Sequence, residues 1–184
     1  MSKKIVVSGY YGFNNAGDEA ILLAVLNGLR KKIPDADITV FSGNPQLTRE
    51  RHDVKSVHRF NLFGILKTLF KSDLLLSGGG SLLQDVTSIK SLLYYLTILF
   101  LGSVLSKKVM LYAQGIGPID RKWLRNLTAF VLKRVDVLAV RDEESQKFLL
   151  SLGINDEYLR DSPALFPQQS VWKGILYHVL LPVQ

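Results

Sequence analysis

The chain has 184 residues, of which 47% are hydrophobic and 21% charged, a composition that suits one globular domain with its own core. It contains no cysteine, which excludes disulfides, thiolate zinc sites and cysteine nucleophiles, and its three histidines lack metal-ligand spacing, so we expect neither a metal nor a cofactor. The net charge of +7 comes from scattered Lys and Arg without interleaved aromatic residues, which argues against nucleic acid as a partner.

The N-terminal segment predicts a strand, a glycine-rich loop and a helix. Residues 3–8 are apolar and β-branched at their centre, and a periodic apolar pattern predicts a helix over 18–33 that Asn15 or Asp18 can cap. The loop between them carries neither a P-loop nor a dinucleotide fingerprint. Such a junction points backbone N–H groups at an anion or a sugar hydroxyl, although the glycines can also serve only to relieve backbone strain. The expected substrate-binding residues are Gly12, Asn14, Asn15, Gly17 and Glu19, with Asp18 beside them.

Similar units follow along the chain. Strands are expected at 4–8, 37–42, 54–59, 73–77, 109–113, 135–140 and 157–160, and helices at 18–33, 62–71, 88–106, 121–134 and 143–152. The polar stretch 44–52 is predicted as a loop or a short helix. Strands that alternate with helices predict an α/β fold, with a Rossmann-like, doubly wound parallel sheet covered on both faces.

One uncharged stretch, Leu92 to Leu105, has 14 residues, whereas a bilayer core needs about 20, so we expect a helix buried under the sheet. No secretory signal follows Lys3 and Lys4, which predicts a cytoplasmic protein. Basic clusters at 30–32 and 121–134 fit either solvated helix faces or a surface attracted to an anionic membrane or a phosphate-bearing acceptor. Peripheral contact with the inner face of the cell membrane therefore stays open.

Ligands of open parallel sheets bind beyond the carboxyl ends of the strands. The strand at 73–77 runs directly into three consecutive glycines, which let a ligand or another backbone approach closely. A purely structural turn needs one glycine rather than three. The expected substrate-binding residues of this segment are Gly78, Gly79, Gly80, Gln84 and Asp85.

The next two strand ends carry further polar residues. Gln114 and Gly115 follow the strand at 109–113, where an amide suits a sugar hydroxyl, although a turn with an incidental glutamine is the alternative. Arg141 follows the strand at 135–140 and can clamp a carboxylate or a phosphate, or else pair with a neighbouring acid. Asp142 is expected to cap the next helix.

Taken in order, four segments of this chain resemble the polysaccharide pyruvyl transferase family, and most of all its bacterial cell-wall members, which pyruvylate secondary wall polymers. The resemblance covers residues 3 to about 165 and lies in Gly9–Leu22, Ser77–Asp85, Tyr112–Pro118 and Val140–Ser145.

The resemblance implies two Rossmann-like domains related to the B-type glycosyltransferases, of which this chain would hold one half. It implies transfer of the enolpyruvyl group of phosphoenolpyruvate to two hydroxyls of one sugar, with formation of a cyclic ketal and release of phosphate. The implied acceptor is a lipid-linked or polymeric saccharide. Much of the cationic set that binds the donor would lie in the second domain.

Ketal formation needs a proton donor for the methylene carbon, a base or acceptor for the sugar hydroxyl, and cations for carboxylate and phosphate. Asp18 or Glu19 can serve the hydroxyl, and Arg141 can face an anionic group. We expect Asp18 and Arg141 to be the catalytic residues, whereas Asn14, Asn15, Gln84 and Gln114 suit the orientation of hydroxyls.

Residues 1–165 are expected to form the N-terminal domain, and 166–184 match no second-domain opening. That tail fits a truncated or frameshifted end, or a segment that packs back on the domain. On this view the chain is inactive by itself, unless another chain supplies the missing half, because half of a cleft cannot exclude water.

Two other classes share these features. A glycosyltransferase or epimerase half-domain that uses a nucleotide sugar would have the same fold, and would respond to a uridine nucleotide rather than to phosphoenolpyruvate. A non-catalytic saccharide-binding module or a decayed fragment would keep its affinity for a saccharide when Asp18 and Arg141 are replaced.

Overall fold

The computed structural model describes residues 2–154, and these form one six-stranded sheet in which every pair of neighbouring strands is parallel. The order across the sheet is β3-β2-β1-β4-β5-β6, so the chain moves outwards from the centre in one direction and then in the other. The strands are β1 (Lys4–Ser8), β2 (Asp37–Ser42), β3 (Lys55–His58), β4 (Leu74–Gly78), β5 (Val109–Gln114) and β6 (Val137–Val140).

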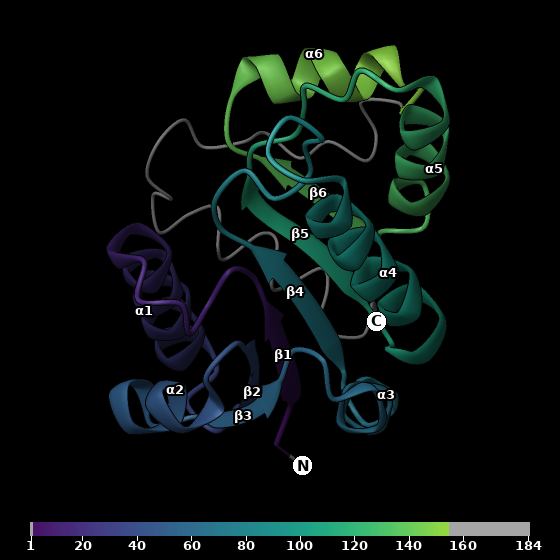
Figure 1. Cartoon of the computed structure of the whole chain (residues 1–184). Helices are drawn as coiled ribbons and strands as arrows, with labels where there is room; N and C mark the ends of the chain where they lie inside the picture. Colours follow the sequence, from purple (N-terminus) through teal and green to yellow (C-terminus); the bar gives the residue numbers. More distant parts are fainter. Residues whose placement is uncertain (1, 155–184) are drawn as a thin grey trace.

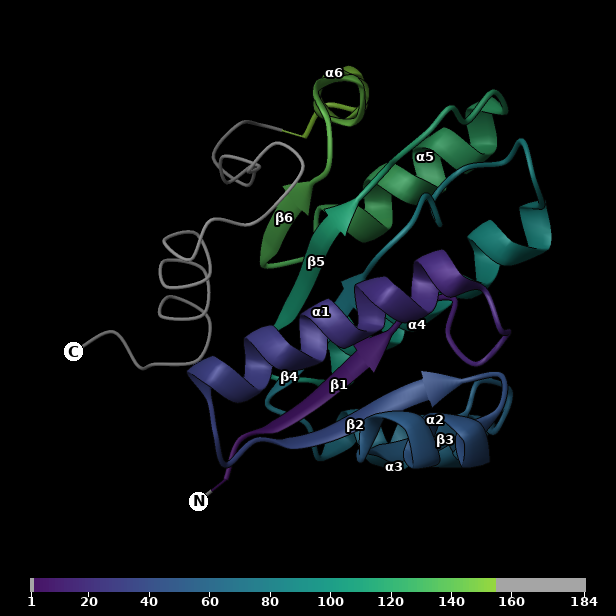
Figure 2. The ribbon, with the colours of Figure 1, turned by 90° about the vertical axis from the view of Figure 1, so that its left-hand side faces the viewer.

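Helices cover both faces of this sheet (Figures 1 and 2). They are α1 (Ala16–Lys32), α2 (Pro45–His52), α3 (Leu62–Phe70), α4 (Ile89–Leu105), α5 (Lys122–Leu132) and α6 (Glu143–Ser151). Helix α1 lies on one face, and α3, α4 and α5 lie on the other. The doubly wound parallel sheet that the alternating pattern predicts is therefore confirmed.

Strands β1, β4, β5 and β6 are buried because they are apolar on both faces. Ile5 and Val7 of β1 pack with the apolar side of α1, whereas Val6 points to the opposite face and packs with α3 and α4. Leu74 and Leu76 of β4 follow the first group and Leu75 the second, as the alternation of side chains along a strand requires.

The observed elements agree with the predicted ones to within a residue or two at most boundaries. The polar stretch 44–52, predicted as a loop or a short helix, forms the short helix α2. Asn44 caps it, since its side chain accepts a hydrogen bond from Leu47 N, and Pro45 occupies the first turn. The predicted strand at 157–160 and the tail at 166–184 lie outside the described residues.

Helix α4 contains the uncharged stretch, and it packs against the sheet through Leu92, Leu96 and Leu99. Within residues 2–154, no helix combines the length and the apolar composition that crossing a membrane requires.

Candidate functional site

The centre of the sheet is the point at which the strand order reverses, because β1 and β4 are neighbours there. In parallel sheets of this kind, the loops that follow these two strands diverge and leave a crevice for a ligand. Here they are the loop at 9–15 after β1 and the glycine-rich loop that begins at Gly79 after β4.

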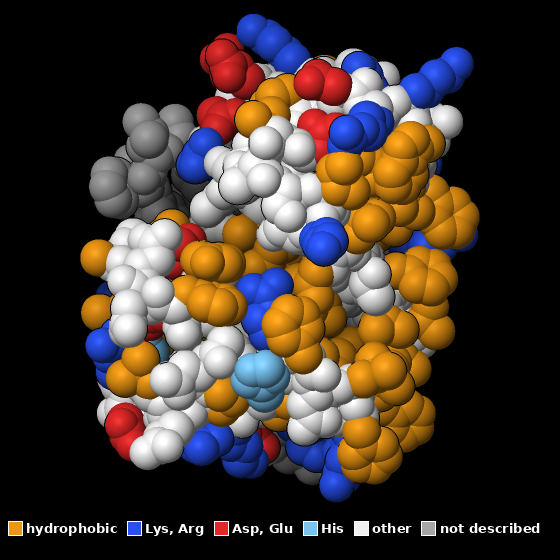
Figure 3. All heavy atoms as spheres, viewed as in Figure 1, with side chains coloured by type: hydrophobic (Ala, Val, Ile, Leu, Met, Phe, Trp, Pro, Cys, Tyr) orange, Lys and Arg blue, Asp and Glu red, His pale blue; other side chains and the backbone are white. Residues whose placement is uncertain are grey.

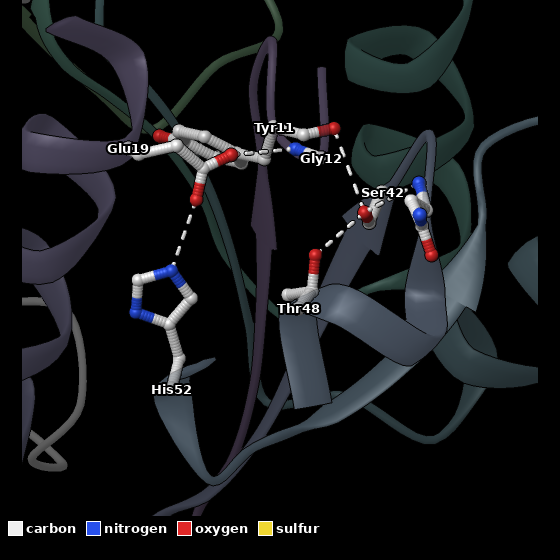
Figure 4. Close-up of polar contacts among 7 residues, drawn as sticks. Tyr11, Gly12, Glu19, Ser42, Thr48 and His52 are labelled. Atoms are coloured by element: carbon white, nitrogen blue, oxygen red, sulfur yellow. Dashed lines mark hydrogen bonds and ion pairs between the residues drawn. The ribbon is translucent and has the colours of Figure 1, made fainter. Parts of the chain in front are cut away.

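The connection between β2 and α2 packs against the first loop and holds it in place (Figure 4). The Ser42 hydroxyl bonds to Thr48 Oγ1 at 2.7 Å and receives a hydrogen bond from Asn44 N at 3.0 Å, and Gly43 N donates to Tyr11 O at 2.9 Å. Gly12 lies directly over this connection with a φ of +80°, and a Cβ atom there would lie 2.6 Å from Asn44 N. Only glycine fits that position.

Glu19 closes the same loop from the side of α1. Its Oε1 accepts a hydrogen bond from Gly12 N at 2.8 Å, and its Oε2 lies 3.0 Å from His52 Nε2 at the end of α2. Both partners are protein groups, so Glu19, predicted to bind substrate, is occupied in tying the loop to two helices (Figure 4).

Asn15 has a structural contact as well, since its side chain caps α1 by accepting a hydrogen bond from Gly17 N at 3.1 Å. Asn14 is exposed and adopts a φ of +56°.

Tyr11 connects the first loop to β4. Its hydroxyl is buried and donates to Gly78 O at 2.6 Å. Burial, followed by the negative charge of Asp18, raises the pKa of the Tyr11 phenol far above its ordinary value. The phenol therefore stays protonated and fixes the separation of the two loops at the switch point.

Asp18 lies in the first turn of α1, next to the glycine-rich loop at this switch point. A Cβ atom on Gly80 would be 3.1 Å from Asp18 Oδ1, so the missing side chain of Gly80 makes room for this carboxyl group. Within residues 2–154, Asp18 has neither a side-chain hydrogen bond nor an ion pair. Partial burial, followed by the charge of Glu19, raises its pKa. A partly buried carboxyl group with a raised pKa in a crevice is a candidate for proton transfer.

The glycine-rich loop brings the next strand end alongside Asp18. Gly79 and Gly80 both have positive φ, +89° and +70°, and Gly80 O accepts a hydrogen bond from Gly115 N at 3.0 Å. A Cβ atom on Gly115 would lie 2.9 Å from an Arg141 Nη atom. The backbones of the two loops therefore form a continuous edge that runs from Asp18 to Arg141.

Arg141 is half-exposed at the far end of this edge, and its Nε lies 3.1 Å from Asp142 Oδ2. Asp142 caps α6 as expected: Ser145 donates to it through its hydroxyl and its backbone N–H, and these bonds, followed by the charge of Arg141, lower the pKa of Asp142 against the opposing effect of burial. The alternative of a salt bridge to a neighbouring acid is thus present, but an exposed pair of this kind binds weakly enough to open for an anion.

Gln114 is fully buried at the end of β5, and neither atom of its amide has a hydrogen-bond partner in the described part of the chain. The strand is irregular here, since Ala113 has a φ of +48° and the register with β6 shifts between Tyr112 and Gln114.

The two polar residues after the triple glycine lie further along the β4–α4 loop. Gln84 donates to Thr87 Oγ1 at 3.2 Å, and Asp85 accepts hydrogen bonds from Asp120 N and Arg121 N. Asp85 therefore ties the β4–α4 loop to the β5–α5 loop.

Among the predicted site residues, the structure brings together Asp18, Gly79, Gly80, Gly115 and Arg141. Two hollows of about 290 and 450 Å³ lie instead around the amino ends of β1 and β2, away from these residues, and Asp37 and Lys55 line both of them. Residues 2–154 hold no cluster of three or more His, Cys, Asp or Glu side chains that would suit a metal ion.

Sequence reasoning missed Arg59, which directly follows β3 and is buried among aromatic rings. The same strand-end argument that singled out Arg141 applies to it, but the predicted strand at 54–59 included Arg59 instead of ending before it. His52 was set aside as a metal ligand, and its contact with Glu19 depends on a fold that no local pattern reveals.

Comparisons with known proteins identify a structure with a similar fold and the family to which the chain belongs. No curated protein sequence matches the chain. A solved structure from Listeria monocytogenes, assigned as a UDP-N-acetylglucosamine 2-epimerase, aligns with a TM-score of 0.50 and 14% sequence identity over 86% of this chain. The chain spans 44% of that structure, and at this identity the likeness shows the fold alone. The family model for polysaccharide pyruvyl transferase matches residues 15–163. The chain therefore belongs to the polysaccharide pyruvyl transferase family.

Proposed function

We propose that this protein takes part in the transfer of a pyruvyl group from phosphoenolpyruvate to a saccharide of a cell wall or exopolysaccharide, as a cyclic ketal. Membership of the family supports pyruvyl transfer to a polysaccharide. The observation that carries the assignment to this site is Asp18, a carboxyl group with a raised pKa and no protein partner in the described residues, placed at the switch point of the sheet.

The reaction balances without a cofactor. One sugar hydroxyl adds to C2 of phosphoenolpyruvate while the methylene carbon gains a proton and becomes a methyl group. A second hydroxyl of the same sugar then forms its bond to C2 as the C2–O bond to phosphate breaks, and phosphate leaves with the remaining proton. Asp18 is proposed to exchange the proton of an acceptor hydroxyl, and Arg141 to hold a carboxylate or phosphate oxygen of the donor.

The acceptor side of the site is proposed to lie on the described residues. Gly80 lies beside Asp18 and accepts a hydrogen bond from Gly115 N, and Asn14, four residues before Asp18, is exposed. Carbonyl, amide and carboxyl groups of this kind suit sugar hydroxyls, which both donate and accept hydrogen bonds.

The donor carries a carboxylate and a phosphate, whereas Arg141 offers one half-exposed guanidinium at this edge. We propose that cations outside residues 2–154 complete the donor site, either in a second domain or on another chain, so that the 184-residue chain alone turns over little or no donor. A charged donor held on one side only would stay open to water, which weakens each of its electrostatic contacts.

The test measures acceptor-dependent phosphate release from phosphoenolpyruvate in two arrangements. One is the 184-residue chain alone, and the other is this chain joined to the second domain of a full-length family member. We expect release in the joined protein only, and replacement of Asp18 by Asn should lower it by about 100-fold or more. The control is Asp35→Asn, in the exposed turn between α1 and β2, at the end of the sheet where the strands begin.

The outcomes separate the parts of the proposal. Release by the chain alone would contradict the need for further cations, but not pyruvyl transfer. Absence of release in both arrangements, with a thermal shift caused by a uridine nucleotide and none by phosphoenolpyruvate, would favour nucleotide-sugar chemistry instead. Unchanged release in Asp18→Asn would remove Asp18 from the reaction.

A further inference from the structure

Arg59 is a buried cation that no carboxylate among residues 2–154 neutralises. It directly follows β3, where its backbone N–H donates to Ser42 O at 2.9 Å, and only 8% of its surface is exposed. Its Nε is buried without a hydrogen-bond partner, and none of the ion pairs among residues 2–154 includes it. Burial of a charge is costly unless the charge is paired, so this arrangement calls for an explanation.

Aromatic rings surround the guanidinium and offset part of that cost. Its central carbon lies 4.1 Å from the ring centre of Tyr94, 5.2 Å from Phe60, 5.3 Å from Phe13 and 5.6 Å from Tyr95. These rings come from three separate segments: the loop after β1, the loop after β3, and α4. Their faces attract a cation but carry no net charge.

The two tyrosines do not supply the missing negative charge. Burial raises the pKa of both Tyr94 and Tyr95, although the charge of Arg59 acts in the opposite direction. Both phenols therefore stay neutral, and the positive charge of Arg59 stays unbalanced by the described residues.

On one side the cluster is open to solvent, because some of its aromatic rings are exposed rather than packed in the core. Phe60 is 72% exposed, and Tyr10 and Phe13, 36% and 41% exposed, stack with their centres 4.3 Å apart. Figure 3 shows this face, where hydrophobic side chains gather around Lys or Arg and His side chains. Exposed apolar surface that borders a polar group is typical of a binding site.

This aromatic cluster adjoins the crevice at the switch point. The negative charge of Asp18 acts on both Tyr11 and Tyr95, and Tyr95 in turn lies beside Arg59. Phe13 and Asp18 belong to the same loop and helix start. Phe13, whose ring lies 5.3 Å from the Arg59 guanidinium, is five residues before Asp18, so the first loop connects the two sites.

We propose that Arg59, with the exposed rings of Tyr10, Phe13 and Phe60, binds a saccharide that carries a phosphate group, with the phosphate against the guanidinium and a sugar ring on the aromatic faces. The proposal rests on the proposed function, because the occupant would be the phosphate-linked end of the acceptor whose hydroxyls meet Asp18. A phosphate supplies a negative charge opposite Arg59, which residues 2–154 do not provide, and it accepts hydrogen bonds from a guanidinium in a matching geometry.

The test is a titration of the 184-residue chain, without phosphoenolpyruvate, by glucose 1-phosphate and N-acetylglucosamine 1-phosphate, with each free sugar and inorganic phosphate for comparison. We expect each sugar phosphate to bind at least about tenfold more tightly than either of its parts, and Arg59→Gln to remove about that factor. Arg134→Gln is the matched control. The Arg134 guanidinium also lies over an aromatic ring, 3.7 Å from the centre of Phe130, but Arg134 is exposed just after the end of α5.

Loss of Arg59 can disturb the core, so exposed rings provide a second test. Phe60→Ala should weaken binding of the sugar phosphates and leave thermal stability unchanged, whereas Phe70→Ala, 74% exposed on α3, should change neither. Equal binding of sugar phosphate and inorganic phosphate, or unchanged binding in folded Phe60→Ala and Arg59→Gln, would overturn the proposal.

Two sources of the phosphate are distinguished by ligand. A lipid-linked acceptor predicts stronger binding of a polyprenyl-phosphate sugar in vesicles than of a UDP-sugar, and a free nucleotide sugar predicts the reverse. In the two-domain protein described above, binding of sugar phosphate without release of phosphate from phosphoenolpyruvate would contradict pyruvyl transfer but not this site. Release with an unchanged KM for the acceptor in Arg59→Gln would overturn this site but not pyruvyl transfer.

Discussion

Asp18 and Glu19 are neighbours in the sequence, but their carboxyl groups lie in different surroundings. Both carboxylate oxygens of Glu19 take part in hydrogen bonds, with Gly12 N and His52 Nε2. Asp18 lies beside Gly80 and has no hydrogen-bond partner in the described residues. We therefore expect one carboxylate to stabilise the fold and the other to be available for chemistry.

Replacement of the two carboxyl groups should separate these roles. Glu19→Gln weakens the hydrogen bonds of the carboxylate with Gly12 N and His52 Nε2, so it should lower the free energy of unfolding by roughly 1–3 kcal/mol. The measurement is urea unfolding, with Glu50→Gln on the exposed face of α2 as the control. An unfolding free energy that is the same for both variants would show that the Glu19 contacts contribute little.

Asp18→Asn should instead change how the stability of the protein depends on pH. Because the pKa of Asp18 is raised in the folded protein, the native state holds this proton more tightly than the unfolded chain does. The contribution of Asp18 to stability is then full below the ordinary aspartate pKa of about 4 and is lost as the pH rises through the raised value.

Thermal unfolding over a pH series tests this sign. The wild-type protein should lose stability relative to Asp18→Asn as the pH rises from about 4 towards neutrality, and the same series with the exposed Asp35→Asn serves as the control. A wild-type protein that gains stability over Asp18→Asn across that range would mean that the ionised carboxylate has a stabilising partner.

The sequence could place Asp18 and Arg141 at one edge because every strand of a parallel sheet ends on the same side. It could not separate Asp18 from Glu19, since the partners of Glu19 are Gly12, within the loop, and His52, 33 residues further along the chain. Nor could it find the charge imbalance at Arg59, which only the surrounding rings of distant segments make visible.

At the scale of elements, the loop after β1 requires a glycine at position 12, whereas the first turn of α1 does not require one at position 17. Gly12 has a positive φ and lies against Asn44 and Ser42, whereas a Cβ atom on Gly17 would meet only Asn15 Oδ1, at 3.4 Å. One glycine is required by the backbone and its close neighbours, and the other stands at an ordinary helical position.

Alanine at these two positions gives a matched pair. Gly12→Ala should lower the free energy of unfolding by more than about 1 kcal/mol, because its backbone is strained for alanine and the β2–α2 connection blocks the methyl group. Gly17→Ala should leave stability unchanged or raise it by up to about 1 kcal/mol, because alanine favours a helix. Urea unfolding measures both, and equal effects would contradict the assignment of Gly12 as a packing position.

Helix α2 shows why the sequence left two alternatives, a loop or a short helix, for the stretch 44–52. Only Thr48 and His52 of this helix are buried, so Pro45–His52 shows no apolar periodicity to detect. Its start nevertheless carries a local signal, an Asn cap followed by proline, that a reading of capping residues would have found. Strands β1, β4, β5 and β6 were predicted well because two-sided burial leaves a continuous apolar run in the sequence.

At the scale of the whole molecule, the layer formed by α3, α4 and α5 presents large apolar side chains to solvent. Phe63 is 78% exposed, Phe70 74%, Val104 64% and Trp123 53%. Hydrophobic side chains accordingly gather along the right-hand side of Figure 3, over these helices. Lys67, in the same layer, adds positive charge between them.

We propose that this helical layer contacts an anionic membrane surface, which would bring a lipid-linked acceptor to the crevice. Each basic side chain near such a surface contributes about 1 kcal/mol, and the exposed rings add apolar contact. The chain should therefore float with vesicles that contain phosphatidylglycerol, but not with neutral vesicles, and about 0.5 M salt should weaken the association by screening the charges.

A paired substitution identifies the face. Phe63→Ala combined with Trp123→Ala should lower the fraction of protein bound to anionic vesicles, because both side chains project from the α3–α4–α5 layer. Leu23→Ala, 47% exposed on α1 at the opposite face of the sheet, should leave that fraction unchanged. If both proteins float equally well, or if flotation persists on neutral vesicles, the membrane contact lies elsewhere or does not depend on charge, and this layer is then free to meet another protein surface.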